Sequence, residues 1–186
     1  PAFTWPSTYL PFHHIGYTVR FSDIDRETWL ADFGDLKSDT RTLSVPVDTF
    51  GSAWPEEDWW GGDCPENGLI DSAQSLLTKW NSIVPTRVVS LSATKSVTSG
   101  EGGFILTQSD EIAEFASRLG AMCSRMPEMS AALGRAYLME ADTILEAKRL
   151  VAEEYHRAFA ELEWQTVPIA TNHYVVAALV DSPKDI

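Results

Sequence analysis

Alternating apolar and polar residues predict strands in the first half of the chain and a hairpin near its middle. Residues 15–21 alternate strictly, as in a strand that is buried on one face. Residues 42–50 alternate again, and Pro46 removes a backbone donor there, which indicates an edge strand. Residues 87–98 are rich in Val, Ser and Thr, and a glycine-rich turn separates them from residues 104–107. These last two segments predict a β-hairpin.

Apolar residues at helical spacing predict four helices. Residues 22–31 predict a short helix, and residues 69–83 predict a second one that ends before a proline. Residues 107–124 predict a third helix, capped by Ser109 or by the threonine two residues before it. Pro127 suits the first position of a helix, and no further proline follows before Pro168. The apolar stripe continues to the end of this segment, so residues 127–163 predict one long helix.

The order of these elements defines the expected fold class. A continuous apolar run over residues 174–180 adds a final, central strand. We therefore expect an α+β fold, with about five short strands in a mostly antiparallel or mixed sheet, one long helix and about three shorter ones. We expect a single domain over residues 1–186. Its first part, residues 1–83, is rich in Trp, strands and loops, and residues 84–186 hold the hairpin, most of the helices and the final strand.

The long helix over residues 127–163 raises a question of size. It would be roughly 55 Å long at the rise of an α-helix, whereas a compact domain of this length is about 40 Å across. The helix therefore bends near Gly134, stops short of Trp164, or packs its far end on another chain. The last alternative is a homo-oligomer formed through residues 127–163.

Composition and charge exclude several classes of protein. The chain has 186 residues, 44% of them hydrophobic, which is too apolar for intrinsic disorder. Its formal net charge of −13 is divided almost evenly between the two halves and opposes binding to nucleic acid or to anionic membranes. No apolar run approaches the about 20 residues of a membrane helix. Two distant cysteines, Cys64 and Cys123, indicate free thiols. We expect a cytoplasmic protein, or one from a virion interior.

One loop combines tryptophan with acidic residues and is the strongest candidate site. Trp anchors the buried centre of many interfaces, and acidic groups around it suit a basic protein partner. An alternative interpretation is that the Trp side chains fold back as a small core under the loop. The predicted partner-binding residues are Trp54, Glu56, Glu57, Asp58, Trp59, Trp60 and Asp63.

Other short motifs do not meet the requirements of the sites that they resemble. Residues 23–27 start like a calcium loop but lack its glycine and its final glutamate. Residues 153–156 contain one Glu-x-x-His pair where a di-iron site needs two. Residues 100–103 lack the lysine of a phosphate loop, and acidic neighbours make Cys64 a poor nucleophile. We assign no catalytic residue, no metal and no cofactor.

Three function classes remain open from the sequence. The first is a non-enzymatic acidic protein-binding module, such as an inhibitor or immunity-type protein that masks a basic partner. The second is a structural assembly subunit of phage or virion type, which would use the long helix and the N-terminal arm. The third is an enzyme with dispersed catalytic residues, for which His13, Asp23, Asp25 and His173 are the candidates. The sequence favours the first class.

Overall fold

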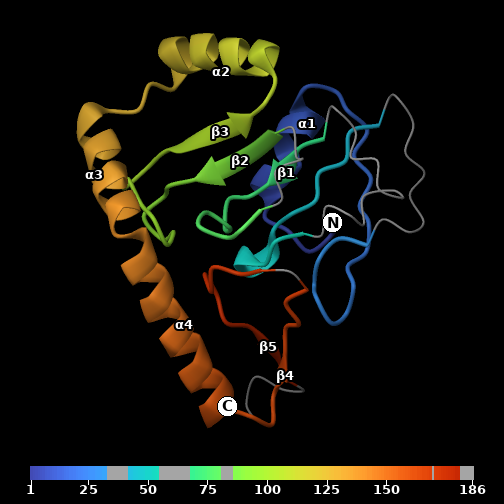
Figure 1. Ribbon diagram of the computed structural model, residues 1–186. Coiled ribbons are helices and arrows are strands. Elements are labelled where there is room, and N and C mark those ends of the chain that lie inside the picture. The colour runs from blue at the N-terminus through green and yellow to red at the C-terminus, as the bar shows by residue number, and fades with distance from the viewer. Residues whose placement is uncertain (33–41, 55–67, 81–85, 169, 181–186) are drawn as a thin grey trace.

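The computed structural model describes residues 1–32, 42–54, 68–80, 86–168 and 170–180. Over these residues the chain has an α+β fold, as expected, with a three-stranded sheet near its centre (Figure 1). Helix α2 lies along one side of this sheet, and helices α3 and α4 run down the edge of the molecule (Figure 1). The helices are α1 (Leu10–His14), α2 (Asp110–Cys123), α3 (Glu128–Met139) and α4 (Ala141–Ala158), with short 3₁₀ helices η1 (Pro6–Thr8) and η2 (Thr49–Gly51). The strands are β1 (Ile70–Asp71), β2 (Thr86–Ser90), β3 (Gly103–Thr107), β4 (Glu163–Trp164) and β5 (Ala178–Leu179).

The central sheet is mixed, and its β2–β3 hairpin confirms the prediction for this part of the chain. β1 pairs with β2 in parallel, with Ile70 opposite Arg87. β2 pairs with β3 in antiparallel orientation, from Thr86 opposite Thr107 to Ser90 opposite Gly103. The expected strand over residues 87–98 is shorter, because the chain turns after Leu91, whose carbonyl accepts from the backbone N–H of Ser99. The two remaining strands, β4 and β5, form a separate sheet.

The N-terminal predictions of a strand and a helix are wrong. Residues 15–21 form no strand, and residues 22–31 form turns closed by an antiparallel bridge between Ile24 and Ala31. Asp25 explains the missing helix, because its Oδ1 accepts from both the backbone N–H and the hydroxyl of Thr28, at 2.7 and 2.8 Å. Such local side-chain bonds offer the backbone a turn in place of a helix.

The predictions for residues 42–50 and 69–83 are also wrong. The first segment contributes one parallel bridge, between Val47 and Asp71, and then the 3₁₀ helix η2. Over its described residues, 69–80, the second segment contains β1 and a series of turns in place of a helix. Here the side chains compete with helical bonding, since Asp71 Oδ1 accepts from the N–H of Ala73 at 3.1 Å.

The helix expected over residues 127–163 is divided into α3 and α4 and ends before Trp164. The chain breaks at Glu140 (φ −100°, ψ 15°) and the second helix already ends at Ala158. Gly134 is not the break: it is helical and buried, and an added Cβ would meet Ser99 Cβ at 3.3 Å. The expected central strand over residues 174–180 is reduced to β5, which pairs with β4 and, among the described residues, with no other strand. Among the described residues, no helix is long and apolar enough to cross a bilayer.

Candidate functional site

A cavity of about 1030 Å³ opens beside the central sheet. Its walls come from several separate parts of the chain: the N-terminal segment, residues 45–50, the region around β1, β2 with the turns that follow it, and residues near the C-terminal end of the described chain. The polar side chains at the cavity include Thr8, Asp71, Gln74, Ser90, Ser92, Thr94, Lys95 and Tyr174. Among the lining residues that the structure describes, Lys95 carries the one amine and Asp71 the one carboxylate.

The parallel pairing of β1 and β2 explains why Asp71 and Lys95 line the same cavity. Asp71 is the last residue of β1, and Lys95 lies in the turn that follows β2, where its N–H donates to the carbonyl of Ser92 at 2.9 Å. The carboxyl ends of parallel strands lie at the same edge of a sheet, and ligands of α/β sheets bind at that edge. The sheet topology thus brings together two residues that are well separated in sequence.

Asp71 is held at both of its carboxylate oxygens. Oδ2 accepts from the hydroxyl of Thr8 at 2.6 Å, and Oδ1 accepts from the N–H of Ala73 at 3.1 Å. Its backbone is held as well, because its N–H donates to the carbonyl of Pro46 at 2.9 Å. The carboxylate therefore has one defined orientation at the cavity wall.

Lys95 lies against an aromatic ring. Its Nζ is 4.8 Å from the centroid of Tyr174, and the Nζ of Lys148, from α4, is 5.9 Å from the same ring. These distances suit cation–π contacts. Asn172 places the ring, since its Oδ1 accepts from the N–H of Tyr174 at 2.9 Å and its Nδ2 donates to the carbonyl of Gln74 at 2.9 Å. The segment that carries Tyr174 is thus tied to the turn that follows Asp71.

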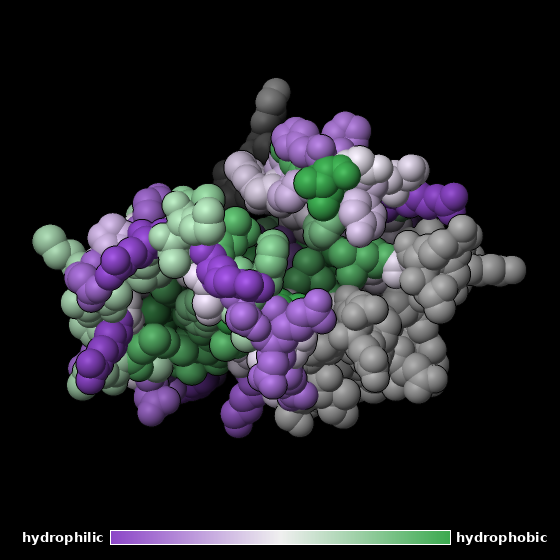
Figure 2. All heavy atoms as spheres, turned by 90° about the horizontal axis from the view of Figure 1, so that it is seen from above, coloured by the Kyte–Doolittle hydropathy of each residue, from purple (hydrophilic) through white to green (hydrophobic). Residues whose placement is uncertain are grey.

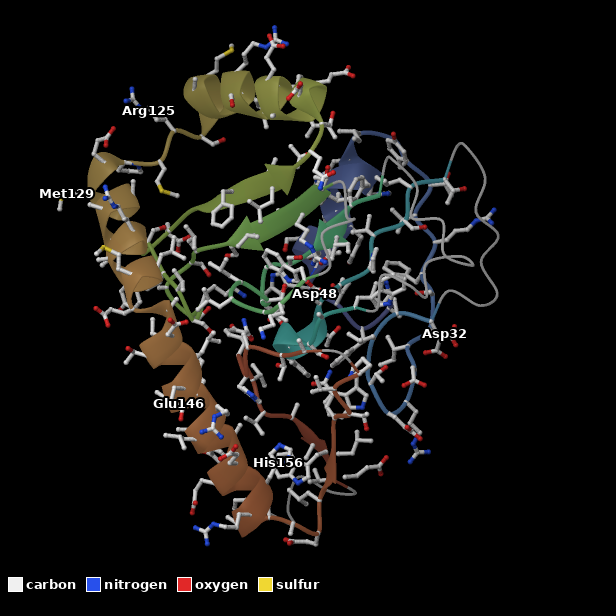
Figure 3. The ribbon with its side chains drawn as sticks, in the orientation of Figure 1. Asp32, Asp48, Arg125, Met129, Glu146 and His156 are labelled. Carbon is white, nitrogen blue, oxygen red and sulfur yellow. The ribbon has the colours of Figure 1, made fainter. Side chains whose placement is uncertain are left out.

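A buried ion pair supports the sheet beneath this site. Asp48, near the centre of the molecule (Figure 3), accepts at Oδ2 from Arg87 at 2.8 Å, from Ser72 at 2.8 Å and from Ser75 at 2.5 Å. Its Oδ1 accepts from the N–H of Trp54 at 2.9 Å. Burial raises the pKa of the Asp48 carboxyl, and the Arg87 guanidinium and the three donors from Ser75, Trp54 and Ser72 act in the opposite direction.

The predicted partner-binding loop is described at one residue only. Trp54 is buried, 3% exposed, and its Nε1 donates to the carbonyl of Ala31 at 3.1 Å, so it belongs to the core. The other six predicted residues lie outside the described part of the chain and stay a prediction: Glu56, Glu57, Asp58, Trp59, Trp60 and Asp63.

The dispersed catalytic candidates are not brought together at the cavity. None of His13, Asp23, Asp25 and His173 lines it. Desolvation lowers the pKa of the His173 imidazole, and the nearby His156 acts in the same direction. Within the described ranges, no group of three or more His, Cys, Asp or Glu side chains is arranged to hold a metal ion.

Sequence reasoning missed Asp71, Lys95 and Tyr174. A usable signal was present for the first, because Asp71 directly follows the apolar pair Leu69 and Ile70. A second signal was the glycine-rich turn at residues 100–103, which follows Lys95 closely and places Gly102 at the cavity.

Comparison with known proteins identifies a family and a fold. The sequence profile of the DegT/DnrJ/EryC1/StrS aminotransferase family matches residues 1–124 and 115–183. The chain is 28% identical to the GDP-perosamine synthase of Vibrio cholerae over 191 residues, which cover 89% of this chain and 52% of that protein. It therefore spans about half the length of this relative.

Two solved structures share the fold. The GDP-4-keto-6-deoxy-D-mannose-3-dehydratase of E. coli, whose structure contains bound hydrated PLP, matches with a TM-score of 0.82 at 18% identity, over 100% of this chain and 59% of that one. An aminotransferase of Helicobacter pylori involved in pseudaminic acid biosynthesis matches with a TM-score of 0.82 at 20% identity, over 97% and 57%. At these identities the likeness establishes the arrangement of the chain.

Proposed function

This chain belongs to the DegT/DnrJ/EryC1/StrS aminotransferase family, and we propose that it forms the cofactor-binding part of a sugar aminotransferase that uses pyridoxal 5′-phosphate (PLP). The observation that carries the proposal is the cavity that contains Lys95 and Asp71 at the carboxyl edge of β1 and β2. The names of the matched proteins support a nucleotide-linked sugar as the substrate class.

Family membership corrects the function predicted from composition. The protein is not an acidic binding module, an inhibitor or an immunity-type protein, and the alternative of a structural assembly subunit is also wrong, because the family consists of enzymes. The predicted basic protein partner has no support for the same reason. Net charge describes how a surface attracts partners, but it does not report chemistry inside a cavity.

The residues at the cavity fit PLP. The cofactor is held in proteins by a lysine that binds its aldehyde and by an acidic or basic partner for its ring nitrogen. Lys95 and Asp71 supply one group of each kind. Trp5, 76% exposed, lines the same cavity and offers an aromatic face for a flat ring. The hydroxyls of Ser90 and Ser92 are donors that a phosphate can use.

The chain's own groups then have separate tasks. When bound, the cofactor acts as an electron sink for the carbon atom that carries the amino group. Lys95 would hold the cofactor covalently, and its Nζ, when free, can take up or give a proton beside the reacting carbon. Asp71 would balance the charge of the ring nitrogen, and the face of Tyr174 would hold the free Lys95 ammonium.

Reductive trapping with borohydride in the presence of PLP, followed by peptide mapping, tests the proposal. We expect the added mass on Lys95 in the wild-type protein and in a Lys79→Ala control, because Lys79 is exposed and does not line the cavity. We expect no added mass at this position, and no amino transfer to a sugar nucleotide, in Lys95→Ala. Trapping on another lysine, or none in the wild-type protein, would contradict the proposal.

Two further expectations from the sequence also stay proposals. A homo-oligomer formed through residues 127–163 is supported by exposed apolar side chains on α3 and α4, including Met129 at 86% and Val151 at 55%. A strictly monomeric protein in light scattering at high concentration would rule it out.

A cytoplasmic location is supported by the exposed free thiol of Cys123, which suits a reducing compartment.

A further inference from the structure

The N-terminal segment supplies a directed pair of hydroxyl bonds to Asp71. Thr8 Oγ1 donates to Asp71 Oδ2 at 2.6 Å, and Thr4 Oγ1 lies 2.8 Å from Thr8 Oγ1. A hydroxyl has one hydrogen to donate, and an ionised carboxylate can only accept. Because the hydrogen of Thr8 is used on Asp71, Thr4 must be the donor in the second bond. The direction of both bonds is therefore determined, from Thr4 to Thr8 to Asp71.

Thr8 is the side-chain partner that sets the orientation of the Asp71 carboxylate. The other bond to this carboxylate comes from the N–H of Ala73, which directly follows β1 and is local to Asp71. Thr8 comes from a distant part of the chain and is itself buried, 9% exposed. A charge-assisted bond to a buried hydroxyl restricts rotation of the carboxylate more than solvent would.

The backbone around Thr8 places its hydroxyl. Thr8 is the last residue of η1, and its N–H donates to the carbonyl of Trp5 at 3.0 Å. Pro6 starts this turn with a backbone angle that suits it. The same short segment therefore carries an aromatic side chain at the cavity, Trp5, and the hydroxyl that contacts Asp71.

We propose that Thr8 is a positioning residue, which holds Asp71 in the orientation that meets the ring nitrogen of the cofactor, and that Thr4 orients Thr8. This inference rests on the proposed function, since it concerns the same cofactor site. In metal sites, removal of the partners that orient the ligating side chains commonly changes metal affinity or activity by 10–100-fold, and we take the lower end of this range for Thr8. We expect a loss of about tenfold in PLP affinity when the Thr8 hydroxyl is removed.

The test compares PLP with 1-deazapyridoxal 5′-phosphate, an analogue in which the ring nitrogen is replaced by carbon. Thr8→Val keeps the shape of the side chain and removes its donor, whereas Thr8→Ser keeps the donor. Dissociation constants for both ligands, read from absorbance on the intact protein, are the measurement. We expect Thr8→Val to lower the affinity for PLP about tenfold, whereas Thr8→Ser should keep the wild-type affinity. Neither variant should change the affinity for the analogue.

Two results would overturn the inference. If Thr8→Val lowers the affinity for PLP and for the analogue equally, Thr8 only supports the fold. If Thr8→Val leaves the affinity for PLP unchanged, Thr8 does not act on Asp71. Thr4→Val provides a second test if Thr8→Val does not fold. We expect this variant to lower the affinity for PLP about threefold, which is less than the direct effect of Thr8→Val. We expect it to leave the affinity for the analogue unchanged. Equal effects on the two ligands in Thr4→Val would again contradict the inference.

The proposed function can fail separately from this inference. If the wild-type protein does not trap PLP on Lys95, the proposed function is wrong. If the wild-type protein traps PLP on Lys95 but Thr8→Val binds PLP as tightly as the wild type, only the role of Thr8 is wrong.

Discussion

The region around Asp48 and the helical edge formed by α2, α3 and α4 differ in the kind of side chain that they bury. Around Asp48 many polar residues have almost no exposed surface, including Asp48, Ser52, Ser72, Ser75 and Asn172, all at 0–1%. Helix α2 shows the reverse, because none of its residues is buried and its apolar side chains reach the surface. Phe115 is 61% exposed and Met122 is 83% exposed. Seen from above, hydrophobic side chains appear on the surface between hydrophilic ones (Figure 2).

The difference shows which region is held by partners among the described residues and which region presents apolar surface. The buried polar groups near Asp48 mostly find partners within the described residues, which makes that region a self-contained support for the cavity. Among the described residues, the apolar faces of the helices are largely exposed, and the chain spans about half of its relative. Large exposed apolar patches usually mark a contact surface.

Breaking the buried ion pair is expected to have the largest effect. Asp48→Ala should lower the free energy of unfolding by about 3–5 kcal/mol, because the buried Arg87 guanidinium would lose the carboxylate that lies 2.8 Å from its Nη1. Urea denaturation measures the loss. The double variant Asp48→Leu with Arg87→Leu should recover part of it, since no uncompensated charge remains. A loss below about 1 kcal/mol in Asp48→Ala would contradict the importance that we give to this pair.

Filling the space at Gly51 is expected to have the next largest effect. Gly51 has a φ of +88°, and an added Cβ would lie 2.0 Å from Asn172 Oδ1, so Asn172 would have to move. Gly51→Ala should cost about 2–4 kcal/mol in the free energy of unfolding, from backbone strain and displaced contacts. Gly100→Ala is the matched control, because Gly100 has a similar φ of +80° but no atom near the added Cβ.

The Gly100→Ala control should cost only the backbone strain, about 1–2 kcal/mol. Equal losses in the two variants, measured by urea denaturation, would show that the contact with Asn172 has no structural importance. Because Asn172 also holds Tyr174, Gly51→Ala should slow the trapping of PLP at Lys95, whereas Gly100→Ala should not.

A polar substitution on the helical edge is expected to have a small effect. Phe115→Ser should change the free energy of unfolding by no more than about 0.5 kcal/mol, because Phe115 is already largely exposed. Thermal or urea unfolding measures this change, with the same wild-type protein as the reference that is used for Asp48→Ala. A loss of more than about 2 kcal/mol would mean that another part of the protein covers this face.

The smallest expected effect concerns an exposed acid, Asp25, for comparison with the buried Asp48. Bonds from the backbone and side chain of Thr28 lower the pKa of the Asp25 carboxyl. A carboxyl whose pKa is lowered by folding contributes stability above its unfolded pKa, and this contribution is lost as the pH falls through the folded pKa. Asp25→Asn should therefore remove a small part of the acid sensitivity of unfolding below about pH 4. An unchanged slope of stability against pH would contradict this.

The elements that the sequence predicted correctly depend on local interactions. Helix α2 begins after Ser109, whose hydroxyl accepts from the N–H of Ile112, as a capping residue should. The hairpin of β2 and β3 was also predicted, since its turn is rich in glycine. In both cases the residues that decide the structure are within a few positions of one another.

The predictions that failed concern segments whose structure depends on distant partners. Residues 69–83 have a helical apolar pattern, yet Ile70 is fully buried in a strand that pairs with β2. The same holds for the candidate site, because Asp71 meets Thr8 and Lys95 meets Tyr174 only after the sheet and the N-terminal segment have come together. No spacing rule within one segment reports such contacts.

The sequence by itself determined the α+β class, the hairpin, the cap of α2 and an acidic charge that is evenly distributed. These follow from local periodicity, turn residues and composition, which need no knowledge of distant contacts. The tertiary structure alone decided where Asp71 and Lys95 lie, because parallel pairing of β1 with β2 places two strand ends at one edge. It also decided that polar residues around Asp48 are buried, since a buried charge is tolerated only where its partners converge in space.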